Sequence, residues 1–224
     1  MEPLLFASSR KGDATVRKID FEQLTPRPWA GAEVAASSVV APNGDECKVW
    51  ADSGSSCLGM DMTSLLSDES FTVGMYCRPT SFQAQYGSTP PTARIIQLGA
   101  YAETTGLLAS MLPGTGTSTL PKFNQFQTSG KIVYSDTICA IGQWQHFAIS
   151  FDRVRKKMIG FVDGIKTLEL DTVGPATLVM YLGGHGDRPA SVGANPTRYT
   201  YRGLMSNPRF NQAYTSENFN PITW

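Results

Sequence analysis

Few side chains in this sequence have the type and spacing that catalysis requires. The 224 residues include only two histidines, His146 and His185. The sequence contains no His-Glu-x-x-His, no Gly-x-Ser-x-Gly and no phosphate-binding glycine loop with its lysine. His146 shares its strand parity with Trp144 and Ser150 and has no acidic, serine or cysteine partner nearby in the sequence, which favours a structural role. These absences exclude most hydrolase and nucleotide-binding chemistry.

An acid pair, Glu169 and Asp171, is the nearest approach to a glycosidase site. Glycoside hydrolysis needs two carboxylates on either side of the scissile bond, and acids at i and i+2 lie on one face of a strand. A lone acid pair at a strand end is more often a solvated face. We therefore predict that the protein is not an enzyme and that it has no catalytic residues.

A basic run, Arg-Val-Arg-Lys-Lys at 153–157, could contact phosphates or an acidic patch on a partner. The alternative, which the pattern favours, is a charged hairpin turn that keeps a sheet edge soluble. Lysine and arginine number 19, as do aspartate and glutamate, so no overall field attracts nucleic acid or an anionic membrane. Any binding must be local.

Loop tyrosines form the one pattern that suits sugar binding. A tyrosine ring can stack on a pyranose face while its hydroxyl bonds to sugar oxygens. Loop tyrosines serve protein interfaces equally well, and the sequence does not choose between the two. The candidate glycan or partner contacts are Tyr86, Tyr101, Tyr199, Tyr201 and Arg188, and Tyr214 lies in a similar setting.

The segment 144–167 organises the elements that would position these residues. Phe147, Ile149 and Phe151 alternate with polar neighbours, which predicts a half-buried strand. Asp163-Gly164 then predicts a two-residue hairpin turn, because glycine tolerates the positive φ that such a turn needs. The segment is therefore an antiparallel meander with one apolar face.

Short strands separated by turns make up most of the remaining chain. No stretch shows a helical period over three turns, and we find no internal repeat. This pattern predicts an all-β protein with two packed antiparallel sheets. Further expected strands cover residues 70–79, 94–98, 107–112, 131–134 and 137–141.

Four stretches carry a family resemblance. Trp-x-His-Phe-Ala-x-x-Phe-Asp at 144–152, followed by Gly-Phe-Val-Asp-Gly at 160–164, resembles the core signature of laminin-G-like, concanavalin A-like jelly rolls. Residues 70–79, 181–184 and 201–210 resemble the early, late and closing strands of that family. The resemblance covers roughly residues 45–215 and implies a two-sheet antiparallel jelly-roll β-sandwich. The family includes lectins, glucanases, adhesion modules and virion proteins, so the resemblance specifies a fold and not a chemistry.

The resemblance implies two further kinds of site, a glucanase site and a calcium site. The residues present indicate whether either is expected. Family glucanases use a Glu-x-Asp-x-x-Glu pattern, but residues 172–175 after Asp171 supply no third acid. Many members hold calcium at a loop rim, where Asp187 and Asn195 could supply oxygen ligands. No Asp-x-Asp-x-Asp cluster is present, so we predict no cofactor and keep calcium as an alternative.

The first 44 residues differ from the rest and are interpreted as an N-terminal arm or linker, with the sandwich spanning 45–224. The assembly arm would bury Leu4, Leu5, Phe6 and Trp29. The arm either docks on a neighbouring subunit or folds back across its own sandwich. A second domain is not expected at this length.

The N-terminus lacks a signal-peptide core, and no stretch reaches the roughly 18 apolar residues needed to cross a bilayer. We therefore expect a protein made in the cytoplasm without membrane insertion. The four cysteines Cys47, Cys57, Cys77 and Cys139 have no Cys-x-x-Cys spacing, which argues against zinc or a redox dithiol. A Cys47–Cys57 bridge in an oxidising setting is kept as an alternative.

These features and the resemblance predict a non-enzymatic structural or adhesive virion component, such as a bacteriophage tail, baseplate or capsid-decoration protein assembled in the host cytoplasm. Its lectin-like sandwich would contact copies of itself, other virion proteins and host glycans, with no specific nucleic acid. The arm and residues 218–224 would bury apolar side chains on neighbours. The alternative is a free carbohydrate-binding protein of cellular origin.

Overall fold

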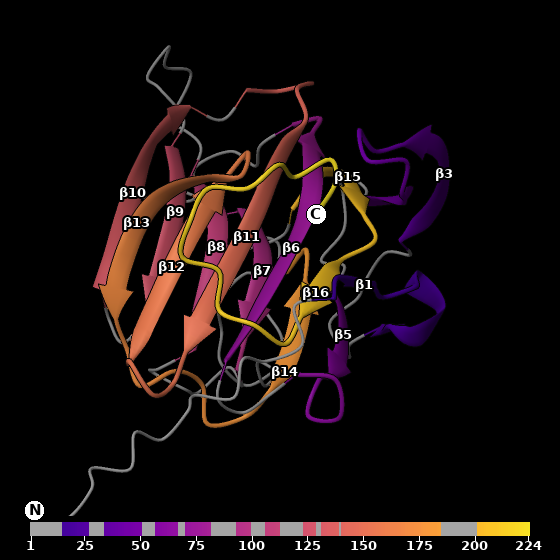
Figure 1. The fold of residues 1–224 in the computed structure, drawn as a ribbon. Coiled ribbons are helices and arrows are strands. Elements are labelled where there is room, and N and C mark those ends of the chain that lie inside the picture. Colours follow the sequence, from indigo (N-terminus) through magenta and orange to yellow (C-terminus); the bar gives the residue numbers. More distant parts are fainter. Residues whose placement is uncertain are drawn as a thin grey trace, which may run out of the picture.

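Two antiparallel sheets stacked face to face form the body of the protein (Figure 1). The computed structural model describes residues 15–26, 34–50, 57–66, 70–81, 93–99, 106–112, 123–128, 131–138, 140–184 and 201–224. Within these ranges the one helical element is a 3₁₀ turn, η1 (Phe21–Gln23), and no helix could span a membrane. The predicted all-β, two-sheet jelly-roll sandwich is confirmed.

The front sheet has strands from both halves of the chain at its centre. Its order is β13 (Ile165–Asp171), β12 (Lys157–Val162), β11 (Gln145–Asp152), β6 (Ser70–Pro79), β15 (Gly203–Ser206), β4 (Glu46–Trp50) and β3 (Ala35–Val40). A further strand, β16 (Arg209–Asn211), pairs with β6 and with β1 (Arg17–Lys18).

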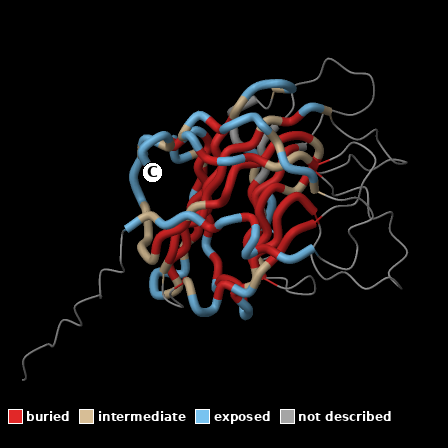
Figure 2. Tube along the Cα trace, turned by 90° about the vertical axis from the view of Figure 1, so that its right-hand side faces the viewer, coloured by how far each residue is buried: buried red, intermediate tan, exposed pale blue. Residues whose placement is uncertain are grey.

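The back sheet covers the inner face of the front sheet. Its order is β10 (Lys131–Ile138), β9 (Phe123–Thr128), β8 (Leu107–Leu112), β7 (Ala93–Leu98), β14 (Val179–Leu182), β5 (Leu58–Asp61) and β2 (Thr25–Pro26). The core lies between the sheets, and buried residues follow both layers in Figure 2. Its largest fully buried side chains include Trp50, Phe71, Phe126, Phe147 and Phe151.

The central meander has the predicted strands and turn. Asp163 and Gly164 both adopt a left-handed backbone, with φ of 53° and 74°, as a two-residue hairpin requires. Elsewhere two boundaries were wrong. Residues 131–138 form a single irregular strand, β10, and residues 201–210 divide between β15 and β16. Strand β9 was not predicted, because its Asn and Gln residues mask the alternation around Phe126.

The prediction that β11 is half-buried was wrong, since all 8 of its residues are buried. One face, with Phe147 and Ile149, packs in the core between the sheets. The other face, with His146 and Ala148, is covered by residues 212–224, which run across the front sheet in Figure 1. This covering segment is far from β11 in sequence, so the alternation within β11 could not reveal it.

Parts of the expected N-terminal arm are strands of the chain's own sandwich. β1 pairs with β16, β2 with β5 and β3 with β4, and Ile19, Phe21 and Leu24 enter the core. For residues 15–26 and 34–44 the chain therefore folds back on its own sandwich. The arm residues Leu4, Leu5, Phe6 and Trp29 lie outside the described residues.

Cysteines 47 and 57 are both buried thiols, and no disulfide joins them. The Cys47 thiol donates to the carbonyl of Asp45 at 3.8 Å and the Cys57 thiol to that of Leu58 at 3.7 Å. The structure therefore does not contain the Cys47–Cys57 disulfide that was kept as an alternative.

Two glycines with similar backbones allow a test of the core packing. Gly174 (φ 75°) and Gly44 (φ 82°) both lie in the left-handed region, but a Cβ on Gly174 would overlap the Phe151 ring, whereas one on Gly44 would meet open space. We expect Gly44→Ala to cost about 1 kcal/mol of unfolding free energy and Gly174→Ala about 3 kcal/mol. Chemical denaturation measures both, and equal losses would show that Gly174 is not needed to pack Phe151.

Candidate functional site

The acid pair on β13 forms ion pairs with lysines. Lys157 Nζ lies 3.2 Å from Glu169 and 2.8 Å from Asp171, and Lys166 Nζ lies 2.7 Å from Glu169. The hydrogen bonds from Lys166 and then Lys157 lower the pKa of Glu169, and the bond from Lys157 lowers the pKa of Asp171. A glycosidase acid needs a raised pKa, so the shifts have the wrong direction for that chemistry.

The basic run at 153–157 also forms contacts within its own chain. Arg153 donates to the carbonyls of Val173 at 3.2 Å and Pro175 at 2.8 Å. Arg155 pairs with Asp152 at 3.1 Å and lies over the ring of Tyr214 at 5.6 Å. These contacts support the interpretation of the run as a charged hairpin turn.

His146 is enclosed by aromatic rings. Its ring centroid lies 4.9 Å from that of Tyr76, 5.6 Å from that of Trp224 and 5.8 Å from that of Phe219. Burial, with a smaller effect of Arg209, lowers the pKa of His146 from 6.5 to about 3. Its buried Nδ1 has no hydrogen-bond partner, so the neutral ring packs as a core side chain.

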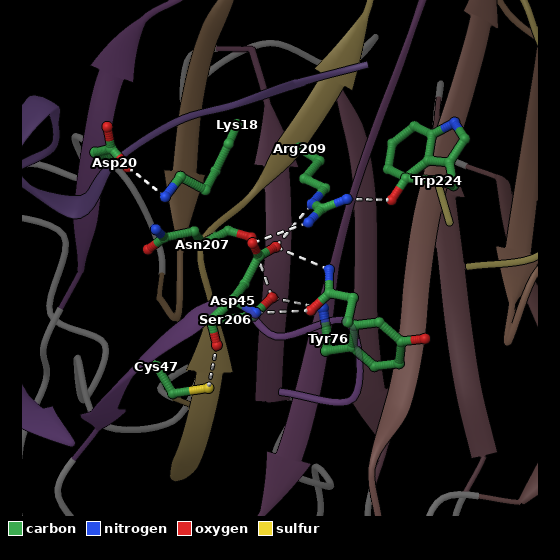
Figure 3. Close-up of polar contacts among 10 residues, drawn as sticks. Lys18, Asp20, Asp45, Cys47, Tyr76, Ser206, Asn207, Arg209 and Trp224 are labelled. Carbon is green, nitrogen blue, oxygen red and sulfur yellow. Dashed lines mark hydrogen bonds and ion pairs between the residues drawn. The ribbon is translucent and has the colours of Figure 1, made fainter. Parts of the chain in front are cut away.

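Asp45 and Arg209 form an ion pair beside this aromatic group (Figure 3). Arg209 Nε and Nη2 lie 2.8 and 3.0 Å from the two carboxylate oxygens of Asp45. A third guanidinium nitrogen, Nη1, donates to the carbonyl of Trp224 at 2.8 Å. The Asp45 carboxylate is 6% exposed and also accepts a 2.8 Å bond from Asn43. All these contacts are within the chain, so the pair is structural.

Of the predicted glycan or partner contacts, only Tyr201 lies among the described residues, and its side chain is buried. Its side chain is 0% exposed, and its hydroxyl donates to the carbonyl of Leu204 at 3.0 Å. The other four candidates, Tyr86, Tyr101, Tyr199 and Arg188, lie outside the described residues, as do the possible calcium ligands Asp187 and Asn195. In the part of the chain that can be described, no three His, Cys, Asp or Glu residues come together as a metal site.

The outer face of the back sheet carries a row of polar and aromatic residues that sequence reasoning missed. The register places Tyr134 on β10, Ser110 on β8 and Arg94 on β7 in one line across the sheet, which passes through position 125 of β9. We call Tyr134, Ser110 and Arg94 the back-sheet row. Neighbouring strands are about 4.8 Å apart, so the row spans about 14 Å, the length of a short oligosaccharide.

Two side chains of this row, Tyr134 and Ser110, differ in exposure. Tyr134, at one end, is 50% exposed. Ser110 lies on the face opposite the core residues Ala109 and Met111, and its hydroxyl is buried without a hydrogen-bond partner. Such an unsatisfied buried group is costly to stability.

A β-bulge arranges the other end of the row. The register shift between Arg94 and Ile96 places Ile95 and Ile96 in the core and Arg94 and Gln97 outside it. The Arg94 guanidinium donates to Gln97 Oε1 at 2.6 Å, and Gln97 Nε2 donates to the carbonyl of Gly99 at 3.3 Å. The pair is thus held in place before any ligand arrives. The alternation in β9 was the one sequence signal that could have indicated this face.

Comparison with protein-family models gives no match, and comparison with curated proteins gives none either. Solved structures do match. Domain 4 of AbnA, a GH43 extracellular arabinanase from Geobacillus stearothermophilus in complex with arabinotriose, has a TM-score of 0.53 and 16% identity over 86% of this chain and 84% of that chain. The enzymatically active domain of bacteriophage CBA120 tailspike protein 2 has a TM-score of 0.59 and 11% identity over 89% of this chain and 30% of that chain.

A third match is the binding domain of botulinum neurotoxin serotype G, with a TM-score of 0.50 and 11% identity over 86% of this chain and 44% of that chain. At these identities the similarities show the fold and not the function. The concanavalin A-like, laminin-G-like jelly roll expected from the sequence is confirmed as a fold.

The buried histidine gives a pH test. The pKa of His146 is 6.5 in an unfolded chain and about 3 in the folded one, so the unfolded chain binds this proton more readily. Stability that is complete above pH 6.5 should therefore fall toward pH 3, by up to about 1.4 kcal/mol per pH unit. We expect His146→Gln to flatten this fall in urea unfolding curves.

The control is His185→Gln, which changes the other histidine. Asp163 accepts a hydrogen bond from the backbone N–H of His146, and burial raises the pKa of its carboxyl. A raised carboxyl pKa changes stability in the opposite direction, but it does so equally in both variants. Parallel curves for His146→Gln and the unaltered protein would rule out a buried neutral His146.

Proposed function

We propose that this protein is a non-enzymatic binding component of a virion, such as a bacteriophage tail, baseplate or capsid-decoration protein, and that its lectin-like sandwich contacts glycans and other proteins. The back-sheet row is the observation on which the proposal rests. It combines an exposed aromatic ring, a prearranged Arg94–Gln97 pair and a buried hydroxyl without a partner.

Sugar recognition fits the chemistry of this row. Carbohydrate sites combine an aromatic ring that stacks on a sugar face with a few fixed polar groups that set its orientation. Tyr134 supplies the ring, and Arg94, which is held by Gln97, supplies a fixed polar group. The similarity to an arabinanase domain in complex with arabinotriose adds support, because it shows a comparable sandwich with a bound oligosaccharide.

A role without catalysis is supported by the acid pair on β13. The lysine contacts keep both carboxylates ionised, and their pKa shifts have the wrong direction for a general acid. Some proteins of similar fold are enzymes, including the tailspike domain, but fold alone does not transfer activity.

The virion role draws support from the similarity to that bacteriophage tailspike domain, which covers 89% of this chain. A specific observation favours the second candidate, a free carbohydrate-binding protein of cellular origin. Strands β1, β2 and β3 complete the chain's own sheets, so this part of the expected arm needs no neighbour. Light scattering at several concentrations separates the two, since assembly with concentration supports the virion component and a constant 24.3 kDa monomer supports the free protein.

Two variants test the row after a glycan array has identified the best ligand. We expect Tyr134→Ala to weaken its binding at least about tenfold, which is about 1.4 kcal/mol. Ser110→Ala should leave binding unchanged, because Ser110 is 0% exposed, and it should leave stability unchanged or raise it by about 1 kcal/mol, because it removes an unsatisfied hydroxyl. Titration calorimetry and denaturation measure the two effects.

Val154→Ala is the matched control, because Val154 is 78% exposed on the turn between β11 and β12. An array without any bound glycan, or equal affinities for all variants, would remove the back-sheet row from the proposal. Release of reducing sugar from the bound glycan would overturn the non-enzymatic part.

A further inference from the structure

The outer face of the front sheet forms a seat for the end of this sequence. Phe219 lies against Phe161 at 5.1 Å between ring centroids and against Trp224 at 5.3 Å. Both Phe219 and Trp224 contact the ring of His146. We call residues 218–224 the clip, and the surface of β11, β12 and their neighbouring hairpin the seat. The seat is a defined aromatic surface that recognises two rings of the clip.

Backbone contacts fix the position of the clip on this surface. The Phe219 N–H donates to the carbonyl of Gly164 at 2.9 Å, and the Lys166 N–H donates to Asn218 Oδ1 at 2.8 Å. At the other end Arg209 donates to the carbonyl of Trp224. A Cβ on Gly164 would overlap the Phe219 carbonyl oxygen. The hairpin glycine therefore leaves a space for the clip, which we call the notch. Specific hydrogen bonds therefore select this peptide.

The clip is ordered largely by its own hydrogen bonds. Asn220 accepts from the N–H groups of Trp224 at 3.0 Å and Thr223 at 3.3 Å through its carbonyl, and from that of Ile222 at 3.0 Å through its side chain. A segment with such internal bonds can leave and return as a unit. Its geometry does not depend on which chain carries it.

The link before the clip is untethered. Ser216 and Glu217 are exposed, and neither forms a hydrogen bond or ion pair in the described structure. Before them, Thr215 is anchored to the front sheet by a 2.7 Å bond from its N–H to Ser150 Oγ. The chain thus has two anchored parts with two free residues between them.

We propose that the clip is exchangeable and that the seat of one copy binds the clip of a second copy. Such an exchange forms the same contacts as the closed chain, so it loses no packing or hydrogen bonding. The equilibrium between the closed chain and the exchanged form depends on the link and on the local concentration of copies. This concentration is high in a particle. This inference rests on the proposed virion role, because it identifies the surface through which copies of the protein would contact each other.

Two full-length variants with complementary defects test the exchange. Phe219→Ala/Trp224→Ala disables the clip and leaves the seat, whereas Gly164→Ala closes the notch and leaves the clip. When the two are mixed at high concentration, we expect the intact clip of one to occupy the intact seat of the other. Sedimentation should show a 1:1 complex in the mixture, and each variant alone should remain a monomer.

A second measurement keeps the test decisive if one variant is unstable. A synthetic peptide of residues 218–224 is added to the Phe219→Ala/Trp224→Ala chain, and titration calorimetry reports binding. A peptide with alanine at both aromatic positions is the control. Binding of the native peptide alone supports the exchange, whereas absence of both the complex and peptide binding would overturn it. Glycan affinity is measured on the same samples, so loss of one proposal is distinguishable from loss of the other.

Discussion

The central strands β6 and β11 need cover on both faces, and the rest of the structure depends on this constraint. Their inner faces meet the back sheet in the core. Their outer faces meet residues 212–224 through the aromatic group around His146 and through Thr72 Oγ1, which donates to the carbonyl of Ala213 at 2.8 Å. The chain itself therefore occupies the outer face of these two strands in this state.

The Asp45–Arg209 pair holds that cover in register. Asp45 belongs to the turn between β3 and β4, Arg209 begins β16, and the guanidinium reaches the carbonyl of Trp224 (Figure 3). A buried carboxylate is costly unless its oxygens are bonded, and here both oxygens accept from one guanidinium in a bidentate arrangement. The same positive charge adds to the burial that keeps His146 neutral. One ion pair thus connects the edge of the front sheet, its centre and the clip.

The sequence predicts structural features that depend on a few neighbouring residues. It does not predict features that depend on contacts between segments far apart in the chain. The meander of β11 to β13 was predictable because strand alternation and Asp163-Gly164 both act over a few residues. The second buried face of β11 was not, since its cover follows 60 or so residues later and has no period of its own. Tyr201 looked like a loop residue, but the fold buries it beside Leu204. The back-sheet row was missed because it exists only across four strands, and the bulge near Ile95 moves Arg94 and Gln97 onto one face.

The two candidate surfaces lie on opposite sides of the sandwich, and this arrangement allows them to act together. The seat is on the outer face of the front sheet and the back-sheet row is on the outer face of the back sheet. A copy that received a neighbour's clip would keep Tyr134 exposed, so contact between copies would not compete with the glycan contact proposed for that ring. An array of such copies could then bind a surface through many weak sites, because linked sites multiply modest affinities. A sandwich that used one face for both contacts would lose this gain, since each neighbour would cover a glycan site.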